Sequence, residues 1–417
     1  MKTKSINPTD NSIIKEYNLY PDQTVNKMIK DCHEGFLLWK HLSFDKRKDI
    51  LLRIAQKLKD DIEEHAKMIS LEMGKPIKES RAEVEKCVWV IEYYAENASD
   101  FLKPETINSN YLDSYIQYDP IGIVLGVMPW NFPYWQVFRF IAPSLMAGNT
   151  CVLKHASNVS GCALLIEELI NNISEHKSIL KTLLISSSQV ENVIKNPYIK
   201  AVTLTGSEYA GSEVAMRAGK EIKKTVLELG GSDCFIVLDD ADVSMAAKTA
   251  ISARFLNSGQ SCIAGKRFLV HETVYDDFVN KVKKYIGKLK MGDPLLENTD
   301  IGPLAKSKFS EELNTLVQSS IKKGAKCLLG AKMKDAFYEP TLLIDVNEKM
   351  DVFKCETFGP VFCVSKISSA EEAIKIANNS DYGLGGSLWT KDIEKGKQIA
   401  TQIETGAVFI NGMTKSD

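Results

Sequence analysis

The 417-residue sequence predicts an α/β protein made of two units, each a parallel β-sheet covered by helices. Two observations support this fold class. Short apolar stretches alternate with amphipathic helical stretches from about residue 121 to 230, and the alternation starts again at residue 235 and runs to the end. Buried strands that alternate with helices are typical of a parallel sheet with both faces covered. With 44% hydrophobic residues, the chain can bury a core of that size.

The first quarter of the chain is expected to be helical. Apolar residues recur at spacings of three and four and form one helical face: Ile54, Leu58, Ile62, Ala66 and Ile69. Gly74-Lys75-Pro76 interrupts this pattern, and a second helical stretch continues to about Leu102. Tyr115–Tyr118 then alternates like a strand, and Asp119-Pro120 predicts a turn into the strand Ile121–Met128.

The remaining elements follow from the same two periodicities. In the first sheet, strands are expected at 150–154, 182–186, 201–204 and 225–228, with helices at 159–172, 189–195 and 208–219. In the second sheet, strands are expected at 235–238, 267–270, 341–345, 361–367, 386–389 and 406–410. The helices between them are expected at 243–256, 273–288, 305–323, 369–378 and 392–402.

Composition excludes several classes of function. The net charge of −2 gives no global electrostatic case for binding nucleic acid or an anionic membrane. Nine scattered cysteines without a CxxC pair indicate a reducing compartment, and the absence of HExxH or a Cys/His cluster argues against a metal. Residues 1–10 lack the apolar core of a signal peptide, and the apolar run 121–128 is too short to span a bilayer. We expect a soluble, cytoplasmic protein.

Two segments suggest covalent catalysis. Cys262 ends the run Asn257–Cys262, in which Gly259 can supply an unusual backbone angle that turns the thiol toward a cavity. Glu228 ends a strand before two glycines, at the sheet edge where α/β folds bind ligands. A thiol and a carboxylate can form and then hydrolyse a thioester. The alternatives are a buried structural cysteine and an exposed strand-end glutamate.

Two further turns follow strands. In Met128–Pro133, the side-chain amide of Asn131 either orders the turn or donates a hydrogen bond to a developing oxyanion. In Thr205–Gly211, the helix N-terminus and the Ser207 hydroxyl could bind a phosphate, or the segment is an ordinary helix cap.

Five motifs carry a resemblance to a known family. MPWNFP, LTGS, ELGG, NSGQSC and ETFGP, in this order and at these spacings, resemble the NAD(P)-dependent aldehyde dehydrogenase superfamily over essentially the whole chain. The resemblance implies two Rossmann-like α/β domains plus an oligomerisation β-hairpin. It also implies that Cys262 is the nucleophile and Glu228 the general base. Asn131 and the Cys262 N–H would form the oxyanion hole.

The resemblance further implies a dinucleotide cofactor. Lys154 and Ser157 would contact the adenine-side ribose. A glutamate often stands at position 157 in NAD-preferring members and would repel a 2′-phosphate, whereas serine leaves room and Lys154 adds a positive charge. We therefore expect NADP to be preferred, with NAD possible and no metal. The other implied cofactor contacts are Trp130, Gly206, Ser207, Leu229, Glu356 and Phe358.

The substrate expectation comes from the helix after Pro133. It should present Trp135 and Arg139, four residues apart, on one face, and in the family this helix lines the aldehyde tunnel. Arg139 either forms an internal salt bridge or binds a substrate carboxylate. A small semialdehyde fits, with succinate semialdehyde as the leading candidate, and the KHASN and ELGGSD variants resemble the succinate-semialdehyde dehydrogenase branch.

The predicted domains follow the same resemblance. Residues 1–114 and 137–229 form a cofactor-binding domain, 230–410 a catalytic domain, and 115–136 with 411–417 a bridging and oligomerisation segment. Family members usually continue for some tens of residues past the position of Asp417, so the hairpin is expected to be incomplete. A homo-oligomer, dimer or tetramer, is implied if the shortened tail permits it. The alternatives are a CoA-acylating aldehyde dehydrogenase and an inactive homologue with a binding or structural role.

Overall fold

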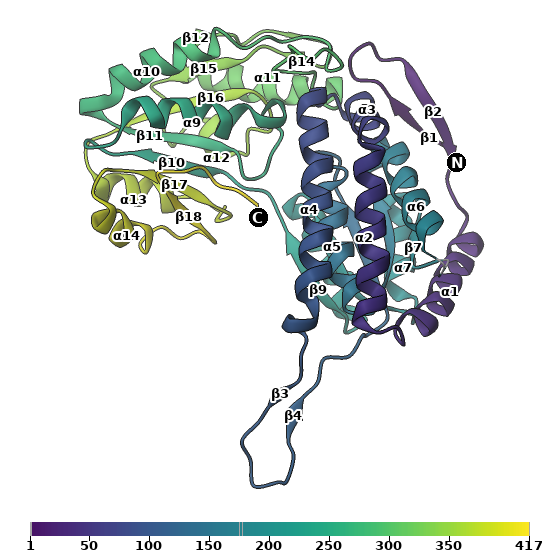
Figure 1. The fold of residues 1–417 in the computed structure, drawn as a ribbon. Coiled ribbons are helices and arrows are strands. Elements are labelled where there is room, and N and C mark those ends of the chain that lie inside the picture. Colours follow the sequence, from purple (N-terminus) through teal and green to yellow (C-terminus); the bar gives the residue numbers. More distant parts are fainter. Residues whose placement is uncertain (1, 175, 177, 417) are drawn as a thin grey trace. The chain divides into compact units, whose positions relative to one another are not determined.

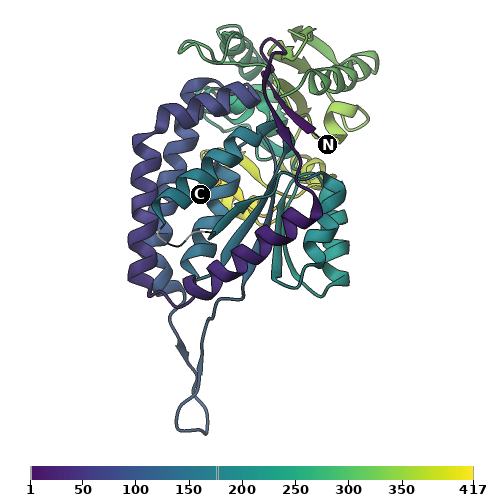
Figure 2. The same ribbon diagram turned by 90° about the vertical axis from the view of Figure 1, so that its right-hand side faces the viewer.

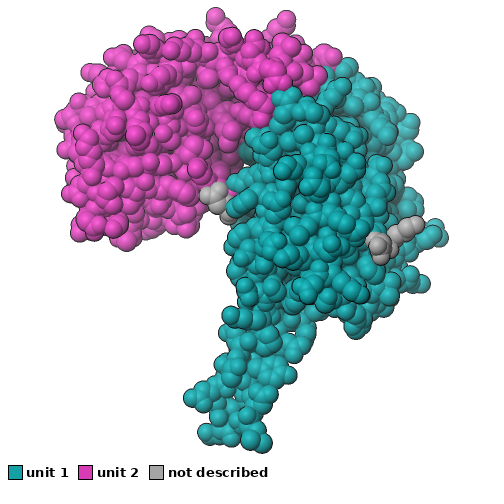
Figure 3. All heavy atoms as spheres, viewed as in Figure 1, with its two compact units in different colours: residues 1–7, 12–72, 80–228 teal, residues 8–11, 73–79, 229–417 magenta. Residues whose placement is uncertain are grey.

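The computed structural model describes residues 2–174, 176 and 178–416. It divides into two compact units, coloured in Figure 3. Unit 1 comprises residues 1–7, 12–72 and 80–228, and unit 2 comprises residues 8–11, 73–79 and 229–417. The predicted domain limits at Met1 and Asp417 fall outside the described residues. Residues 115–136 lie in unit 1, and residues 411–416 lie in unit 2.

Unit 1 is built on a five-stranded sheet in which every neighbouring pair is parallel. The order is β7-β6-β5-β8-β9. The strands are β5 (Ile123–Met128), β6 (Thr150–His155), β7 (Leu180–Thr182), β8 (Ile199–Thr205) and β9 (Lys224–Glu228). The predicted parallel sheet is therefore confirmed. The strand expected at 182–186 is wrong, because only Leu180–Thr182 pairs as a strand and Ser186 already begins a capped 3₁₀ turn.

Helices cover both faces of this sheet (Figure 2). On one face, α1 (Asp22–Trp39), α7 (Val190–Lys195) and α8 (Glu208–Lys220) pack on the strands and form one row. On the other face lie α5 (Trp135–Met146) and α6 (Ser160–Ile173), which also contact α2 (Phe44–Asp60). The remaining helices are α3 (Ile62–Met73) and α4 (Ile77–Phe101), so the helical first quarter is as predicted.

Two antiparallel hairpins complete unit 1. The first pairs β1 (Lys2–Ile6) with β2 (Ile13–Asn18), and the sequence pattern did not predict it. The second pairs β3 (Glu105–Thr106) with β4 (Tyr115–Ile116) and projects away from the rest of the unit (Figures 1 and 2). Its tip carries Tyr111 and Leu112, which are both exposed.

Unit 2 has a seven-stranded sheet in the order β12-β15-β16-β11-β10-β17-β18, parallel except for the edge pair β12–β15 (Figure 1). The strands are β10 (Asp233–Val237), β11 (Gly265–His271), β12 (Lys326–Leu329), β15 (Thr341–Ile344), β16 (Val361–Ile367), β17 (Gly386–Trp389) and β18 (Val408–Ile410). A small separate ladder pairs β13 (Met333–Lys334) with β14 (Phe337–Tyr338).

The second sheet also buries both faces. One core cluster packs on α9 (Val243–Phe255) and α10 (Glu272–Ile286). The other packs on α11 (Ser307–Lys322), α12 (Asp351–Lys354), α13 (Ala370–Asn378) and α14 (Ile393–Ala400). This two-sided burial explains why its strands read as continuous apolar runs. Among the described residues, no helix has the length and apolar character needed to cross a bilayer.

Candidate active site

Most predicted site residues of unit 1 lie at the carboxyl edge of its sheet. Asn131 follows the end of β5, Ser157 follows β6, and Ser207 follows β8. Glu228 is the last residue of β9 and pairs with Thr205. Because all five strands run in the same direction, their carboxyl ends meet at one edge, which is where open α/β sheets bind ligands.

The turn that carries Asn131 is held by the buried His155 side chain, which sequence reasoning missed. Nε2 of His155 lies 2.9 Å from the Pro133 carbonyl, while the Ala156 N–H donates to Nδ1 of the same ring at 2.9 Å. Nδ1 also lies 3.2 Å from the Met128 carbonyl oxygen, and burial lowers the pKa of His155 to about 4, which keeps the ring neutral near pH 7. Asn131 itself is buried.

The helix after this turn is capped by Glu83. Its Oε1 atom accepts hydrogen bonds from the N–H groups of Tyr134 (2.8 Å) and Trp135 (2.9 Å), at the start of α5. A carboxylate at this place satisfies N–H groups that have no partner within the helix and interacts favourably with its dipole. The cap fixes the direction of α5, which carries the two predicted substrate residues.

Those two substrate residues already have partners within unit 1. The Lys86 ammonium lies 4.4 Å from the centre of the Trp135 ring, and the ring is buried. Nη2 of Arg139 lies 3.6 Å from Oε2 of Glu228. The internal salt bridge left open for Arg139 therefore exists, and its partner is the residue expected to act as the general base. Both side chains remain partly exposed, at 26% and 41%, so a ligand can reach them.

The same edge has groups that fit a phosphorylated dinucleotide. Ser207 is exposed and caps α8 by accepting a hydrogen bond from the Ala210 N–H at 3.3 Å, which leaves its own O–H to donate. The Gly206 N–H instead donates to the Glu228 carbonyl at 2.9 Å, so we assign it no phosphate contact. Lys154 is half-buried on β6 and Ser157 is exposed just beyond it. A cation, two hydroxyls and a helix N-terminus are the donors that phosphates require.

In unit 2, Cys262 follows a turn with an uncommon backbone. Three successive residues adopt positive φ: Asn257 (56°), Ser258 (54°) and Gly259 (76°). The sequence predicted an unusual backbone angle at Gly259 alone. A side chain at Gly259 would meet the Gly359 backbone, so both the angle and the space require glycine. Positive φ in residues other than glycine is costly and is concentrated at functional sites.

Side-chain hydrogen bonds stabilise this turn. Asn257 donates from Nδ2 to the Gln260 carbonyl at 3.0 Å, and the Gln260 N–H donates to the Asn257 carbonyl at 3.0 Å. Oε1 of Gln260 accepts from the Ala305 N–H at 3.0 Å. Cys262 then leaves the turn half-buried, whereas six of the other cysteines are buried and two are exposed. A fixed, accessible thiol is what a cysteine nucleophile needs.

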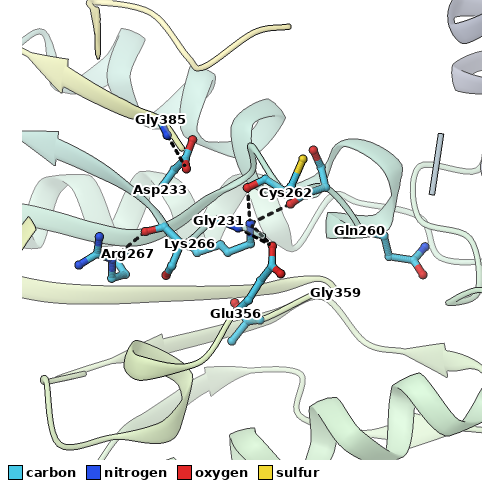
Figure 4. Close-up of polar contacts among 12 residues, drawn as sticks. Gly231, Asp233, Gln260, Cys262, Lys266, Arg267, Glu356, Gly359 and Gly385 are labelled. Atoms are coloured by element: carbon cyan, nitrogen blue, oxygen red, sulfur yellow. Dashed lines mark hydrogen bonds and ion pairs between the residues drawn. The ribbon is translucent and has the colours of Figure 1, made fainter. Parts of the chain in front are cut away.

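Beside Cys262 lies a cluster of buried charge, shown in Figure 4. Lys266, which is fully buried on β11, lies 3.1 Å from Oε1 of Glu356. The same oxygen accepts from the Gly231 N–H at 3.2 Å. A Cβ on Gly231 would lie 2.5 Å from the Cys262 carbonyl oxygen, so only glycine fits there. The sequence motifs predicted Glu356 and Cys262 as site residues, whereas no motif pointed to Lys266.

The turn after Glu356 is held from within the core. The fully buried Arg254 donates to the carbonyls of Thr357 (2.7 Å) and Val361 (2.5 Å) and also to that of Gly359. Phe358, in the middle of this turn, is half-buried, as is Leu229 at the start of unit 2. Within the described part of the chain, no group of three or more His, Cys, Asp or Glu side chains has the arrangement of a metal site.

Comparisons with known proteins identify the family of this chain. The model of the aldehyde dehydrogenase family matches residues 1–417. A protein of Synechocystis sp., described as a "probable succinate-semialdehyde dehydrogenase [NADP(+)]", is 44% identical over 420 residues, which cover all of this chain and 92% of the relative. The succinate-semialdehyde dehydrogenase [NADP(+)] of Mycobacterium avium is also 44% identical, over 423 residues that cover 90% of its length.

A solved structure of a relative has the same fold. The succinic semialdehyde dehydrogenase of Streptococcus pyogenes, crystallised with NADP+ as its cofactor, superposes with a TM-score of 0.96 at 35% identity. The match covers 99% of this chain and 92% of that one.

Proposed function

The chain belongs to the aldehyde dehydrogenase family, and from that premise we propose that it oxidises a small semialdehyde to the carboxylate with NADP as cofactor. Succinate semialdehyde is the leading candidate, supported by the names of its relatives and by the half-buried Arg139 on α5. The observation that carries the proposal is the half-buried Cys262 thiol at the end of a turn with three successive positive φ angles.

In the proposed reaction, the Cys262 thiolate attacks the aldehyde carbon and forms a C–S bond. The oxyanion that results accepts hydrogen bonds from the Asn131 amide and the Cys262 N–H. Each donor stabilises the transition state by about 3–4 kcal/mol. The oxyanion re-forms its C=O bond as the C–H bond of the same carbon breaks, which leaves a thioester on Cys262; bound NADP+ would supply the acceptor for the departing hydride. Glu228 then takes a proton from water, whose oxygen attacks the thioester carbon. The C–S bond breaks, the carboxylate leaves, and the Cys262 thiolate is restored.

The residues that we assign to the cofactor fall in both units. Lys154, Ser157 and Ser207 would bind the adenine-side ribose and the phosphates, and Trp130 would lie near them. Leu229, Glu356 and Phe358 of unit 2 would contact the nicotinamide half. The absence of a carboxylate at position 157 and the charge of Lys154 support a preference for NADP over NAD. Accordingly, we propose that unit 1 is the main cofactor-binding domain and unit 2 carries the nucleophile.

We also propose a homo-oligomer in the cytoplasm. The exposed Tyr111 and Leu112 at the tip of the projecting hairpin favour burial against another copy of the chain. All nine cysteines are unpaired, which fits a reducing compartment. Light scattering coupled to size-exclusion chromatography measures the assembly, and a monomeric mass would refute the oligomer.

The central experiment compares two aldehydes of equal chain length. NADP reduction should be fast with succinate semialdehyde and much slower with butanal, which lacks the carboxylate. Cys262→Ala should abolish turnover, while the control Cys327→Ala, at an exposed cysteine, should keep it. Normal turnover by Cys262→Ala would refute the nucleophile. A product that forms only when CoA is added would favour the CoA-acylating alternative, and no turnover with any aldehyde would favour the inactive homologue.

A further inference from the structure

The site contains a buried lysine, Lys266, to which the proposed reaction assigns no role. It is the second residue of β11, and its side chain is fully buried. The ammonium has three acceptors, which are the Ser261 carbonyl at 2.8 Å, the Cys262 carbonyl at 2.8 Å and Oε1 of Glu356 at 3.1 Å (Figure 4). An ammonium has three N–H donors, so these acceptors use all of them.

Burying a lysine here is costly. Desolvation lowers the pKa of Lys266, and the nearby Glu356 and Asp233 carboxylates oppose that shift, while Arg254 adds to it. Buried ion pairs are frequently no more stable than an apolar replacement of similar volume. Stability of the fold alone is therefore a weak reason to bury a lysine here. The positions of its three acceptors indicate a second role.

The first acceptor determines the direction of a functional group. The Ser261 carbonyl and the Cys262 N–H belong to one planar trans peptide, so they point in opposite directions. Binding the carbonyl to Lys266 turns the Cys262 N–H to the other side of that peptide. Figure 4 shows the Cys262 sulfur on the side away from the Lys266 ammonium. The N–H that we assign to the oxyanion hole therefore faces away from the ammonium, as the thiol does.

The third acceptor fixes a carboxylate. Both Lys266 and the Gly231 N–H contact Oε1 of Glu356, and neither of these contacts involves Oε2. The Glu356 side chain remains 19% exposed, so the carboxylate is anchored through one oxygen and still reachable. A carboxylate in this state is prepared to accept hydrogen bonds from a ribose diol without first losing the freedom of its side chain.

We propose that Lys266 is a positioning residue that orients, through one buried ammonium, both the oxyanion donor at Cys262 and the cofactor-binding carboxylate of Glu356. This proposal rests on the function proposed above, because that function assigns the ribose contact to Glu356. Lys266 acts through other groups and touches neither the substrate nor the cofactor. Its loss should therefore weaken NADP+ binding and slow the chemical step, without changing the KM for the aldehyde.

The test uses Lys266→Met, Glu356→Gln and the double variant in the full chain. NADP+ affinity is measured by isothermal titration without aldehyde, and kcat is measured with succinate semialdehyde. Lys281→Met is the matched control, because it removes a lysine from a surface ion pair of the same unit. Since a hydrogen bond to a charged group contributes roughly tenfold to a hundredfold in an equilibrium, Lys266→Met should weaken NADP+ binding and lower kcat by about tenfold or more each.

The double variant separates the two paths. Its NADP+ affinity should equal that of Glu356→Gln, because Lys266 acts on the cofactor through Glu356, while its kcat should be lower than that of Glu356→Gln. It also removes the Glu356 charge that Lys266→Met alone would leave without its ion-pair partner, so it is the second variant in which folding is checked, by its thermal midpoint. An unchanged NADP+ affinity in Lys266→Met, or losses of affinity that multiply in the double variant, would overturn the inference. An unchanged affinity in Glu356→Gln would instead refute the proposed role of Glu356, and with it the cofactor half of the inference.

Discussion

Nη2 of Arg139 lies 3.6 Å from Oε2 of Glu228, and this ion pair joins the residue proposed to bind the substrate to the residue proposed to activate water. Partly exposed pairs of this kind contribute little to stability. A substrate carboxylate can therefore replace Glu228 as the partner of Arg139 at low cost. Binding of a carboxylate-bearing aldehyde would then release the Glu228 carboxylate for its role as a base.

Arg139→Met should discriminate between aldehydes. Removing a charge-assisted contact to the substrate carboxylate should lower kcat/KM for succinate semialdehyde by about a hundredfold. The kcat/KM for butanal should change by less than about threefold, a difference smaller than 1 kcal/mol. Steady-state kinetics with both aldehydes measure this ratio, and Arg217→Met, which breaks a surface ion pair of unit 1, is the control. An equal loss with both aldehydes would mean that Arg139 acts only through Glu228.

Glu228→Gln should separate the two halves of the reaction. The amide keeps the size of the side chain but cannot take a proton from water, so thioester hydrolysis should slow by about a hundredfold or more. Rapid quench should then show a burst of one NADPH per active site and an acyl group on Cys262. Glu221→Gln, at the end of α8, should show wild-type kinetics. Unchanged turnover without acyl-enzyme accumulation would rule out the base role.

Ser157→Glu should reverse the cofactor preference. A carboxylate at this exposed position accepts hydrogen bonds from ribose hydroxyls but repels a 2′-phosphate, and juxtaposed like charges cost several kcal/mol. The kcat/KM with NADP should fall by about a hundredfold, and that with NAD should rise. Ser187→Glu, an exposed serine of the same unit, should leave the ratio unchanged. Equal or better efficiency with NAD in the wild-type protein would already contradict the predicted preference.

Sequence periodicity predicted the two sheets because both are buried on two faces, and continuous apolar runs alternating with helices leave few other arrangements. It misplaced the strand at Leu180–Thr182, because the buried side chains Leu183–Ile185 extend the apolar run after the strand has ended. It missed β1 and β2, whose residues are mostly exposed and carry no apolar pattern.

The site shows a similar division. The motifs predicted Cys262, Glu228, Asn131 and Glu356 as site residues. Lys266, His155 and Glu83 carry no motif. Each acts through contacts with backbone groups that the local sequence does not reveal. A lysine at the start of a strand reads as a solvated residue until the structure shows that three acceptors surround it. Buried polar groups must have partners, but the sequence does not show where those partners lie.

His155→Gln should change how stability depends on pH. Burial lowers the pKa of His155 to about 4 from 6.5, so between these values the unfolded chain binds a proton that the folded protein does not. The stability that this group contributes is present above pH 6.5 and is lost as the pH falls toward 4, by up to about 3 kcal/mol. Glutamine can still donate to the Pro133 carbonyl and accept from the Ala156 N–H, but it does not titrate. The thermal midpoint of the variant should therefore fall less than that of the wild type between pH 7.5 and 4.5.

His65, whose pKa is also lowered to about 4 by burial, is present in both proteins and cancels in the comparison. Parallel pH curves for the two proteins would show that His155 is not the neutral, buried link between β6 and the Asn131 turn, and His271→Gln, at the end of β11, is the control that should follow the wild type.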